Sequence, residues 1–213
     1  MSDDPAAEAG RWLAQRLGDA VRRRGRAFAA VSGGSTAPPL FDAVLARDVP
    51  WADVTIWQVD ERVAPDGHPA RNAGQLADLP CRVELMPVTD DDLVAGAARY
   101  AAGLPDRFDI VHLGLGDDGH TASWPPGHDV VDSDAAVAAI GEFNGYPRMT
   151  LTPSVVNAAR ARLMLISGVA KAPMVQRWVL GDASLPVARG RPTDTWVMLD
   201  SAAAAELPDA PAR

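Results

Sequence analysis

The chain has 213 residues, of which 47% are hydrophobic and 23% charged, a composition that is typical of a globular protein and excludes a disordered polymer. Its 28 acidic residues outnumber its 20 basic ones, and the formal charge of -8 argues against broad electrostatic binding to nucleic acid or to anionic membranes. A lone cysteine, Cys81, excludes an intrachain disulfide and a cysteine metal cluster, so the cytoplasm is the expected compartment.

The length suits one domain over residues 1–213. The acidic start lacks the features of a secretory signal, and no run approaches the roughly 20 apolar residues that span a bilayer. A tail rich in alanine and proline is expected to fray from about residue 201. The residues do not fix the oligomeric state, and we favour a monomer.

Short runs rich in Val, Ile, Leu and Trp predict buried strands, and apolar residues at helical spacing between them predict helices. The strands are predicted at residues 27–31, 54–59, 83–86, 108–113, 149–152, 163–167 and 195–199. The helices are predicted at residues 8–24, 36–46, 91–102, 153–161 and 170–180, the fourth with Thr152 as N-cap. This alternation predicts a three-layer α/β fold, in which helices cover both faces of a mostly parallel, twisted sheet.

The loop after the first predicted strand reads Ser32-Gly33-Gly34-Ser35-Thr36. In parallel sheets, ligands bind beyond the carboxyl ends of the strands. Two glycines let the backbone approach an anion, and free N–H groups and hydroxyls can donate to phosphate oxygens at a helix start. The loop lacks the lysine of a nucleotide-binding P-loop, which favours a monophosphate over ATP. A glycine turn with a serine cap is the alternative.

Residues 114–120 read Gly-Leu-Gly-Asp-Asp-Gly-His and follow the strand predicted at 108–113. The glycine spacing matches a dinucleotide fingerprint, but we reject that match because Asp117 and Asp118 would repel a pyrophosphate. A carboxylate beside a loop histidine suggests a general base instead, with His120 oriented by Asp118 or by Asp117. A loop histidine bonded to solvent or backbone is the alternative.

Three charged residues, Asp60, Glu61 and Arg62, close the strand predicted at 54–59. Arg62 is the natural partner of an anion or oxyanion because its guanidinium stays charged and presents a fork of donors. Asp60 and Glu61 either hold Arg62 in place or act as acid and base. A solvated turn with local ion pairs is the alternative.

Two further cations stand near predicted strands, Arg148 and Lys171. Lys171 is the only lysine in the chain, and a compact ammonium at a helix start suits phosphate binding. The alternative is that a single lysine has survived by chance.

The spacing of the histidines fits no metal motif, so we predict no metal, and His112 is expected to be a hydrogen-bonded core residue. Without a Gly-x-Ser-x-Gly motif, a serine triad is not expected.

Taken in order, five segments resemble the 6-phosphogluconolactonase family, which shares an α/β superfamily of modified Rossmann type with glucosamine-6-phosphate deaminases and isomerases. They are residues 32–36, 60–62, 114–123, 148–153 and 167–172. The resemblance implies hydrolysis of 6-phospho-D-glucono-1,5-lactone to 6-phosphogluconate in the oxidative pentose phosphate pathway, with a sugar-phosphate lactone as partner and no metal or cofactor.

Carried onto this chain, the resemblance makes His120 the residue that activates water, with Asp118 beside it. It places Arg62 at the developing oxyanion or at the carboxyl end of the substrate. The substrate and its phosphate are assigned to Ser32, Gly33, Gly34, Ser35, Thr36, Asp60, Arg148 and Lys171. The chain departs from the family at Trp124 and Pro125, where we expect a different pocket wall, and at Arg71.

Two other functions compete with lactone hydrolysis. A deaminase or aldose–ketose isomerase on the same scaffold typically carries a glutamate five residues after the histidine, and Pro125 occupies that position here. A non-catalytic sugar-phosphate sensor would be fused to a DNA-binding module, and the acidic chain offers no basic recognition helix. Both features favour the lactonase.

Overall fold

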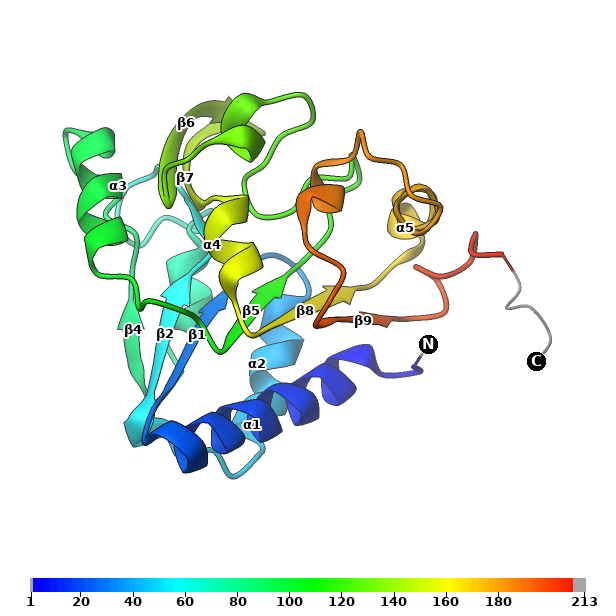
Figure 1. Ribbon diagram of the computed structural model, residues 1–213, viewed down its shortest axis with the longest axis horizontal. Helices are drawn as coiled ribbons and strands as arrows, with labels where there is room; N and C mark the ends of the chain where they lie inside the picture. Colours follow the sequence, from blue (N-terminus) through cyan, green and yellow to red (C-terminus); the bar gives the residue numbers. More distant parts are fainter. Residues whose placement is uncertain (1, 209–213) are drawn as a thin grey trace.

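The computed structural model describes residues 2–208, and its centre is a six-stranded sheet (Figure 1). The strands follow the order β4-β2-β1-β5-β8-β9, and every neighbouring pair is parallel. Their bounds are β1 Ala27–Val31, β2 Val54–Gln58, β4 Arg82–Glu84, β5 Ile110–Leu113, β8 Ala161–Ile166 and β9 Thr195–Leu199. The predicted α/β fold with a mostly parallel sheet is confirmed.

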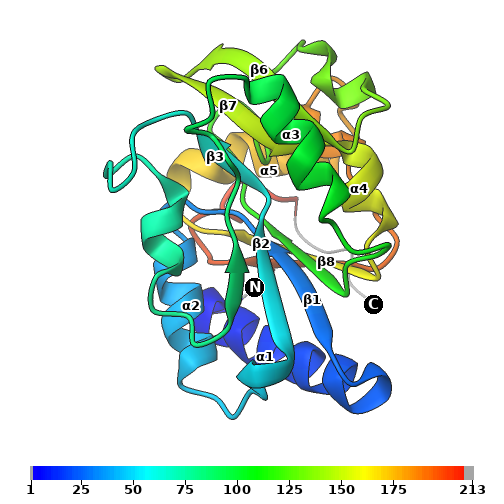
Figure 2. The same cartoon turned by 90° about the vertical axis from the view of Figure 1, so that its left-hand side faces the viewer.

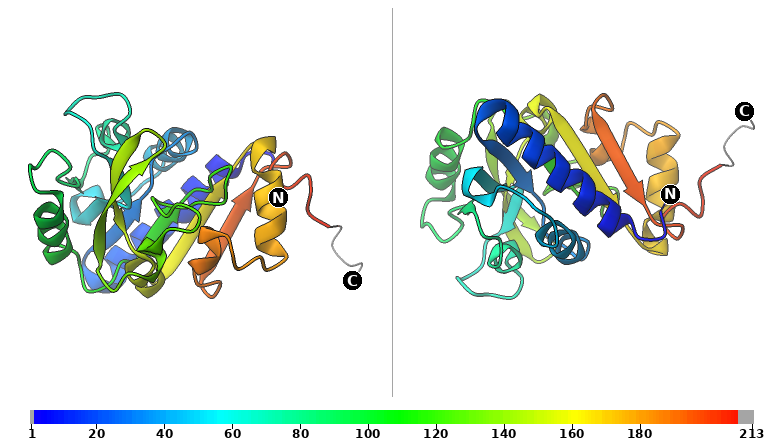
Figure 3. Two further views of the ribbon diagram at one scale, coloured as in Figure 1. Left: turned by 90° about the horizontal axis from the view of Figure 1, so that it is seen from above. Right: turned by 90° about the horizontal axis from the view of Figure 1, so that it is seen from below.

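Helices cover both faces of this sheet. On one face lie α1 Pro5–Arg24 and α2 Ala37–Leu45, and on the other lie α3 Leu93–Ala102, α4 Pro153–Ala158 and α5 Ala172–Val179 (Figure 2). The view from below in Figure 3 shows α1 running diagonally across its face. Ala29 and Ile110 pack toward α1 and α2, whereas their neighbours Ala30 and Val111 pack into the opposite core. This alternation buries both faces of the central strands.

The connection from α1 to β1 sets the start of the sheet. Asp4 caps the helix by accepting the backbone N–H of Ala7 at 2.9 Å, so α1 begins three residues before the predicted start. Gly25 ends it with φ +73° and donates to Val21 O at 2.7 Å. A left-handed residue is easiest for glycine, which explains the sharp turn into β1.

A second, antiparallel sheet has the order β3-β7-β6 and lies above the main sheet in Figure 1. It consists of β3 Asp60–Arg62, β6 Val137–Phe143 and β7 Tyr146–Leu151. One prediction is corrected here: the strand predicted at 149–152 belongs to this small sheet rather than to the main one. Residues 60–62 are a strand, so the alternative of a solvated turn is wrong. β6 was not predicted. Because β3 begins directly after β2, the small sheet stands at the carboxyl end of the main one.

Several helix boundaries differ from the predictions by one to three residues. The helix predicted at 170–180 divides into a 3₁₀ turn, Val169–Lys171, and α5. Thr152 occupies the N-cap position of α4, but its hydroxyl donates to Ala135 O at 2.6 Å instead of capping the helix.

Residues 201–207 form turns against the core, unlike the tail that the sequence predicted to fray from about 201. Ala203 and Ala204 are buried, and Ala203 N donates to Asp200 Oδ1 at 2.6 Å. Residues 209–213 of that tail lie outside the described residues. Over residues 2–208, every helix is too short or too polar to cross a bilayer.

Candidate active site

Loops at the carboxyl end of the main sheet and strands of the small sheet surround a cavity of about 670 Å³. The loops follow β1, β5 and β8, and the strands are β3 and β7. Every residue that the sequence assigned to the site lines this cavity. These residues are Ser32, Gly33, Gly34, Ser35, Thr36, Asp60, Arg62, Asp118, His120, Arg148 and Lys171.

His120 and Asp118 form a hydrogen-bonded pair on the loop after β5. His120 Nδ1 lies 2.5 Å from Asp118 Oδ1, which also accepts the backbone N–H of His120 at 3.0 Å. Burial alone raises the pKa of Asp118, but the hydrogen bonds and charge of His120 outweigh it, and the pKa lies below its usual value. An ionised carboxylate needs a donor, so we assign the proton to Nδ1, which leaves Nε2 as the basic nitrogen of the ring.

The glycines of this loop create the space that the imidazole occupies. A Cβ at Gly116 would lie 2.0 Å from His120 Nδ1, so no larger residue fits there with the ring in place. Gly116 N donates to His120 O at 2.7 Å, and Gly119 has φ +86°. Phe143 packs edge-on against the ring, with centroids 4.9 Å apart. The imidazole is therefore held between a bare backbone and an aromatic ring.

Asp117 contacts Lys171, and this contact separates the roles of the two neighbouring aspartates. The Lys171 ammonium forms an ion pair with Asp117 Oδ1, while Asp118 alone of the two contacts the imidazole. The Asp117 side chain is 68% exposed and that of Lys171 24% exposed. Lys171 therefore lines the cavity while paired with an exposed aspartate, and water can replace Asp117 in this ion pair.

The glycine loop after β1 joins the two sides of the cavity. Gly34 has φ +100°, and a Cβ at Gly33 would lie 2.2 Å from Asn72 Oδ1. The sequence predicted free N–H groups in this loop. Gly34 N is instead engaged, because it donates to Gln75 Oε1 at 3.1 Å. Ser32 Oγ is buried and has no partner among residues 2–208. Ser32 lines the cavity, so this unpaired hydroxyl lies at its wall.

Arg62 and Arg148 lie directly opposite each other in the β3–β7 ladder. Arg62 Nη1 donates to Ala70 O at 2.7 Å and to Asn72 Oδ1 at 3.0 Å, and Arg148 donates twice to Phe143 O. Burial and then the nearby charge of Arg62 lower the pKa of Arg148. Like charges opposite each other in a sheet are unfavourable, so this pair favours an anion in the cavity.

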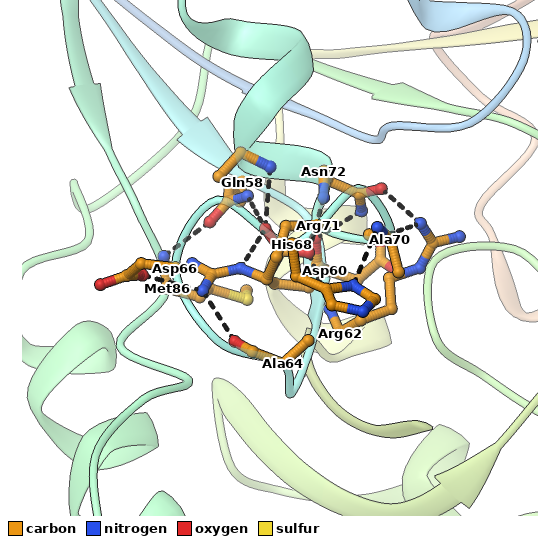
Figure 4. Close-up of polar contacts among 12 residues, drawn as sticks. Gln58, Asp60, Arg62, Ala64, Asp66, His68, Ala70, Arg71, Asn72 and Met86 are labelled. Atoms are coloured by element: carbon orange, nitrogen blue, oxygen red, sulfur yellow. Dashed lines mark hydrogen bonds and ion pairs between the residues drawn. The ribbon is translucent and has the colours of Figure 1, made fainter. Parts of the chain in front are cut away.

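Glu61 connects β3 to the segment that orients Arg62. Figure 4 shows Arg62 with Ala70 and Asn72, the two residues of this segment that accept its hydrogen bonds. The Glu61 carboxylate is fully buried and accepts four hydrogen bonds. The donors are Arg62 N at 2.8 Å, Asn72 N at 2.7 Å, Gln58 Nε2 at 2.7 Å and Ala73 N at 2.9 Å. Arg71 adds an ion pair, with its Nε 3.2 Å from Glu61 Oε2. With both oxygens occupied, Glu61 positions Arg62 and has no free lone pair directed at a substrate.

Asp60 is the second buried carboxyl of β3, and it lines the cavity. Burial raises its pKa, although the hydrogen bond from Ser123 Oγ at 2.7 Å and the charges of Arg62 and Arg148 oppose this shift. The charges of the two arginines act on this carboxyl, so its ionised form partly offsets them.

The turn between β6 and β7 adds two cavity residues that the sequence analysis missed, Asn144 and Tyr146. Phe143 pairs with Tyr146, so Asn144 and Gly145 form a tight two-residue hairpin turn. Asn144 has φ +52° and Gly145 has φ +84°. Asn-Gly between apolar runs is a strong hairpin signal that could have located this wall.

Two further expectations are corrected. His112 is completely buried, but both ring nitrogens lack a partner among residues 2–208, so it is not the hydrogen-bonded core residue that we expected. Trp124 does not form the pocket wall: its indole is buried in the core and donates to Leu151 O at 2.8 Å. Pro125 does not line the cavity either.

The described part of the chain holds no group of three or more histidine, cysteine or acidic side chains arranged to bind a metal ion. The donors that face the cavity are instead guanidinium, ammonium, hydroxyl and imidazole groups, which suit an oxygen-rich anion.

Comparison with known proteins places this geometry in context. Residues 1–199 match the model of a family described as glucosamine-6-phosphate isomerases/6-phosphogluconolactonase. A 6-phosphogluconolactonase from Nostoc sp. is 32% identical over 90% of this chain and 89% of the relative.

Solved structures give the same picture. A 6-phosphogluconolactonase from Shewanella baltica superposes with a TM-score of 0.84 and 26% identity, covering 92% of each chain. A monomeric glucosamine-6-phosphate deaminase gives a TM-score of 0.80 at 21% identity and 96% coverage of each chain, which shows a shared fold. Fold alone therefore does not separate the two activities.

Proposed function

The chain belongs to the glucosamine-6-phosphate isomerase/6-phosphogluconolactonase family, and we propose that it hydrolyses 6-phospho-D-glucono-1,5-lactone to 6-phosphogluconate, a step of the oxidative pentose phosphate pathway. The names of its relatives support this activity. The observation that carries the mechanism is a histidine–carboxylate pair facing the same cavity as a cluster of cations.

His120 is the proposed general base. Because Asp118 holds the proton on Nδ1, Nε2 takes a proton from water as the water oxygen attacks the lactone carbonyl carbon. The tetrahedral intermediate then collapses, and the bond between that carbon and the ring oxygen breaks. The imidazolium returns its proton to the departing ring oxygen, which becomes a hydroxyl group. Water is thus added across one ester bond, and the histidine returns to its starting state.

Arg62 stabilises the charge that develops on the carbonyl oxygen during the attack. Its Nη1 is already engaged with Ala70 and Asn72, so the guanidinium is held in one orientation before the substrate arrives. A fixed donor of this kind loses little energy to reorganisation in the transition state.

The phosphate end of the substrate is proposed to bind the remaining donors: the hydroxyls of the glycine loop, Arg148 and Lys171. Binding energy from the phosphate then fixes the carbonyl near His120.

Glucosamine-6-phosphate deamination is the rival activity on this fold, and Pro125 argues against it. A proton shuttle between sugar carbons needs a further acid or base near the histidine, and a proline supplies no titratable side chain.

The activity itself is tested by generating the lactone enzymatically and following proton release with and without the protein, with ammonia release from glucosamine 6-phosphate as the control. Faster ammonia release with no lactone hydrolysis would overturn the proposal.

A further inference from the structure

A second cavity, of about 600 Å³, lies at the opposite end of the main sheet from the candidate active site. Arg26 precedes β1, Asp109 precedes β5 and Arg160 precedes β8, so the cavity is lined where these strands begin. The candidate active site lies where the same strands end. The chain turns from α1 into β1 here, at the lower left of Figure 1. No step of the proposed hydrolysis uses this cavity.

This cavity is cationic in an acidic protein. Its lining includes four arginines and two aspartates, which leaves a local charge of about +2 against -8 for the whole chain. Asp109 is buried and fully engaged: it accepts Phe28 N at 2.9 Å and pairs with Arg24 at 2.5 Å and Arg160 at 3.3 Å. One carboxylate therefore fixes two guanidinium groups at the cavity wall.

The other two arginines, Arg26 and Arg107, have no carboxylate within ion-pair distance among residues 2–208. Arg107 Nε donates to Ala158 O at 2.6 Å, and the Arg26 guanidinium lies 5.2 Å from the centre of the Phe28 ring. Both are thus positioned by uncharged groups, with terminal N–H groups left over. The lining therefore keeps a positive charge of about +2, which an anion in the cavity would balance.

The remaining wall is apolar and partly aromatic. Phe28 and Trp57 pack edge to face with centroids 5.4 Å apart, and Leu104 and Pro105 line the cavity beside them. A hollow of several hundred Å³ that combines apolar walls with a few convergent polar groups is the usual form of a small-molecule site.

We propose that this cavity binds a small phosphomonoester with an aromatic body, such as a nucleoside monophosphate. A phosphomonoester carries about -1.5 to -2 at neutral pH, which matches the local charge. Its oxygens accept bonds from Arg26 and Arg107, with Arg24 and Arg160 nearby, and its planar body lies against the Phe28 side. A sugar phosphate would share the charged contacts but not the aromatic one.

The test is calorimetric titration of the full-length protein with AMP, ribose 5-phosphate and adenosine. We expect AMP to bind most tightly, ribose 5-phosphate more weakly and adenosine undetectably. Arg26→Gln and Arg107→Gln should each weaken AMP binding about tenfold. The matched control is Arg23→Gln, an exposed arginine on the last turn of α1 outside this cavity, which should leave the affinity unchanged.

Lys171→Ala separates this site from the candidate active site. AMP affinity that falls in Lys171→Ala but not in Arg26→Gln would place the ligand at the other end of the sheet and overturn the proposal. Equal affinities for AMP and ribose 5-phosphate would overturn the aromatic contact, and no binding of either phosphate at millimolar concentration would overturn the site itself. Lactone hydrolysis in Arg26→Gln should match the wild type, so either proposal can fail alone.

Discussion

The two walls of the candidate active site differ in burial. One, the loop wall, consists of residues 114–120 and 167–171, which leave the main sheet. The other, the arginine wall, consists of β3 and β7 with residues 70–73. On the loop wall the pairs are open to solvent, since Asp117 is 68% and Asp118 42% exposed. On the arginine wall the Glu61 carboxylate is completely buried.

This difference separates positioning from chemistry. Exposed ion pairs contribute about 0–1 kcal/mol and rearrange readily, whereas removing one partner of a buried pair costs several kcal/mol. The guanidinium of Arg62, which we propose to face the developing charge, stands on the buried arginine wall. The proposed base and Lys171 stand on the exposed loop wall, whose ion pairs can exchange with solvent. Substitutions on the two walls should therefore have separable effects on turnover, binding and stability.

The largest effect should follow from His120→Ala on the loop wall. Loss of the proposed base should lower kcat by about 10²–10⁴-fold, while the free energy of unfolding changes by less than about 0.5 kcal/mol. Steady-state kinetics and urea unfolding measure the two quantities. His128→Ala is the control, because His128 does not line the cavity. Wild-type turnover in His120→Ala would remove the proposed base.

On the arginine wall, Glu61→Gln should lower the free energy of unfolding by about 3–5 kcal/mol, because Arg71 and the amide donors lose a buried charge. The matched control is Asp66→Asn, which removes the other carboxylate that contacts Arg71 but whose side chain is 85% exposed. That change should cost less than about 1 kcal/mol. Equal losses in the two variants would show that burial does not distinguish the walls.

His112 lies beside the glycine loop that joins the walls, because its backbone carbonyl accepts Ser32 N at 3.1 Å. The titration of its buried ring provides a pH test. Burial lowers its pKa to about 4 from 6.5, so between pH 6.5 and 4 only the unfolded chain takes up the proton. The free energy of unfolding should therefore fall by about 3 kcal/mol as the pH falls through this window. In His112→Leu that part of the acid dependence should vanish, whereas His128→Leu should keep it. An unchanged acid limb in His112→Leu would exclude this residue as its source.

The sequence predicted the parts of this molecule that depend on local pattern. Runs of apolar residues located the strands of the main sheet, and Gly25 after three arginines marked the end of α1. The small sheet was missed because β3 is three charged residues long, and its pairing with β7 joins positions nearly 90 residues apart. No local pattern encodes that contact.

The candidate active site was likewise predictable only where local sequence patterns mark it. Loops with glycines and a histidine were recognisable, and all the predicted residues line one cavity. Which aspartate contacts His120 could not be read from adjacent positions, because the choice depends on Lys171 reaching Asp117 across 54 residues. The partners of Glu61 were hidden for the same reason, since its donors include residues 71–73, which fold back onto β3.

The smallest predicted effect concerns Asp117, the ion-pair partner of Lys171. In the proposed binding mode, Asp117 competes with the substrate phosphate for this ammonium. Asp117→Asn should free the ammonium and lower KM by about two- to fivefold, the range of an exposed ion pair, with unfolding unchanged. In a Lys171→Ala background the same substitution should leave KM unaltered, so a double-mutant cycle isolates the pair. A higher KM in Asp117→Asn would mean that the aspartate holds Lys171 in its binding position, and the loop wall would then be preorganised like the arginine wall.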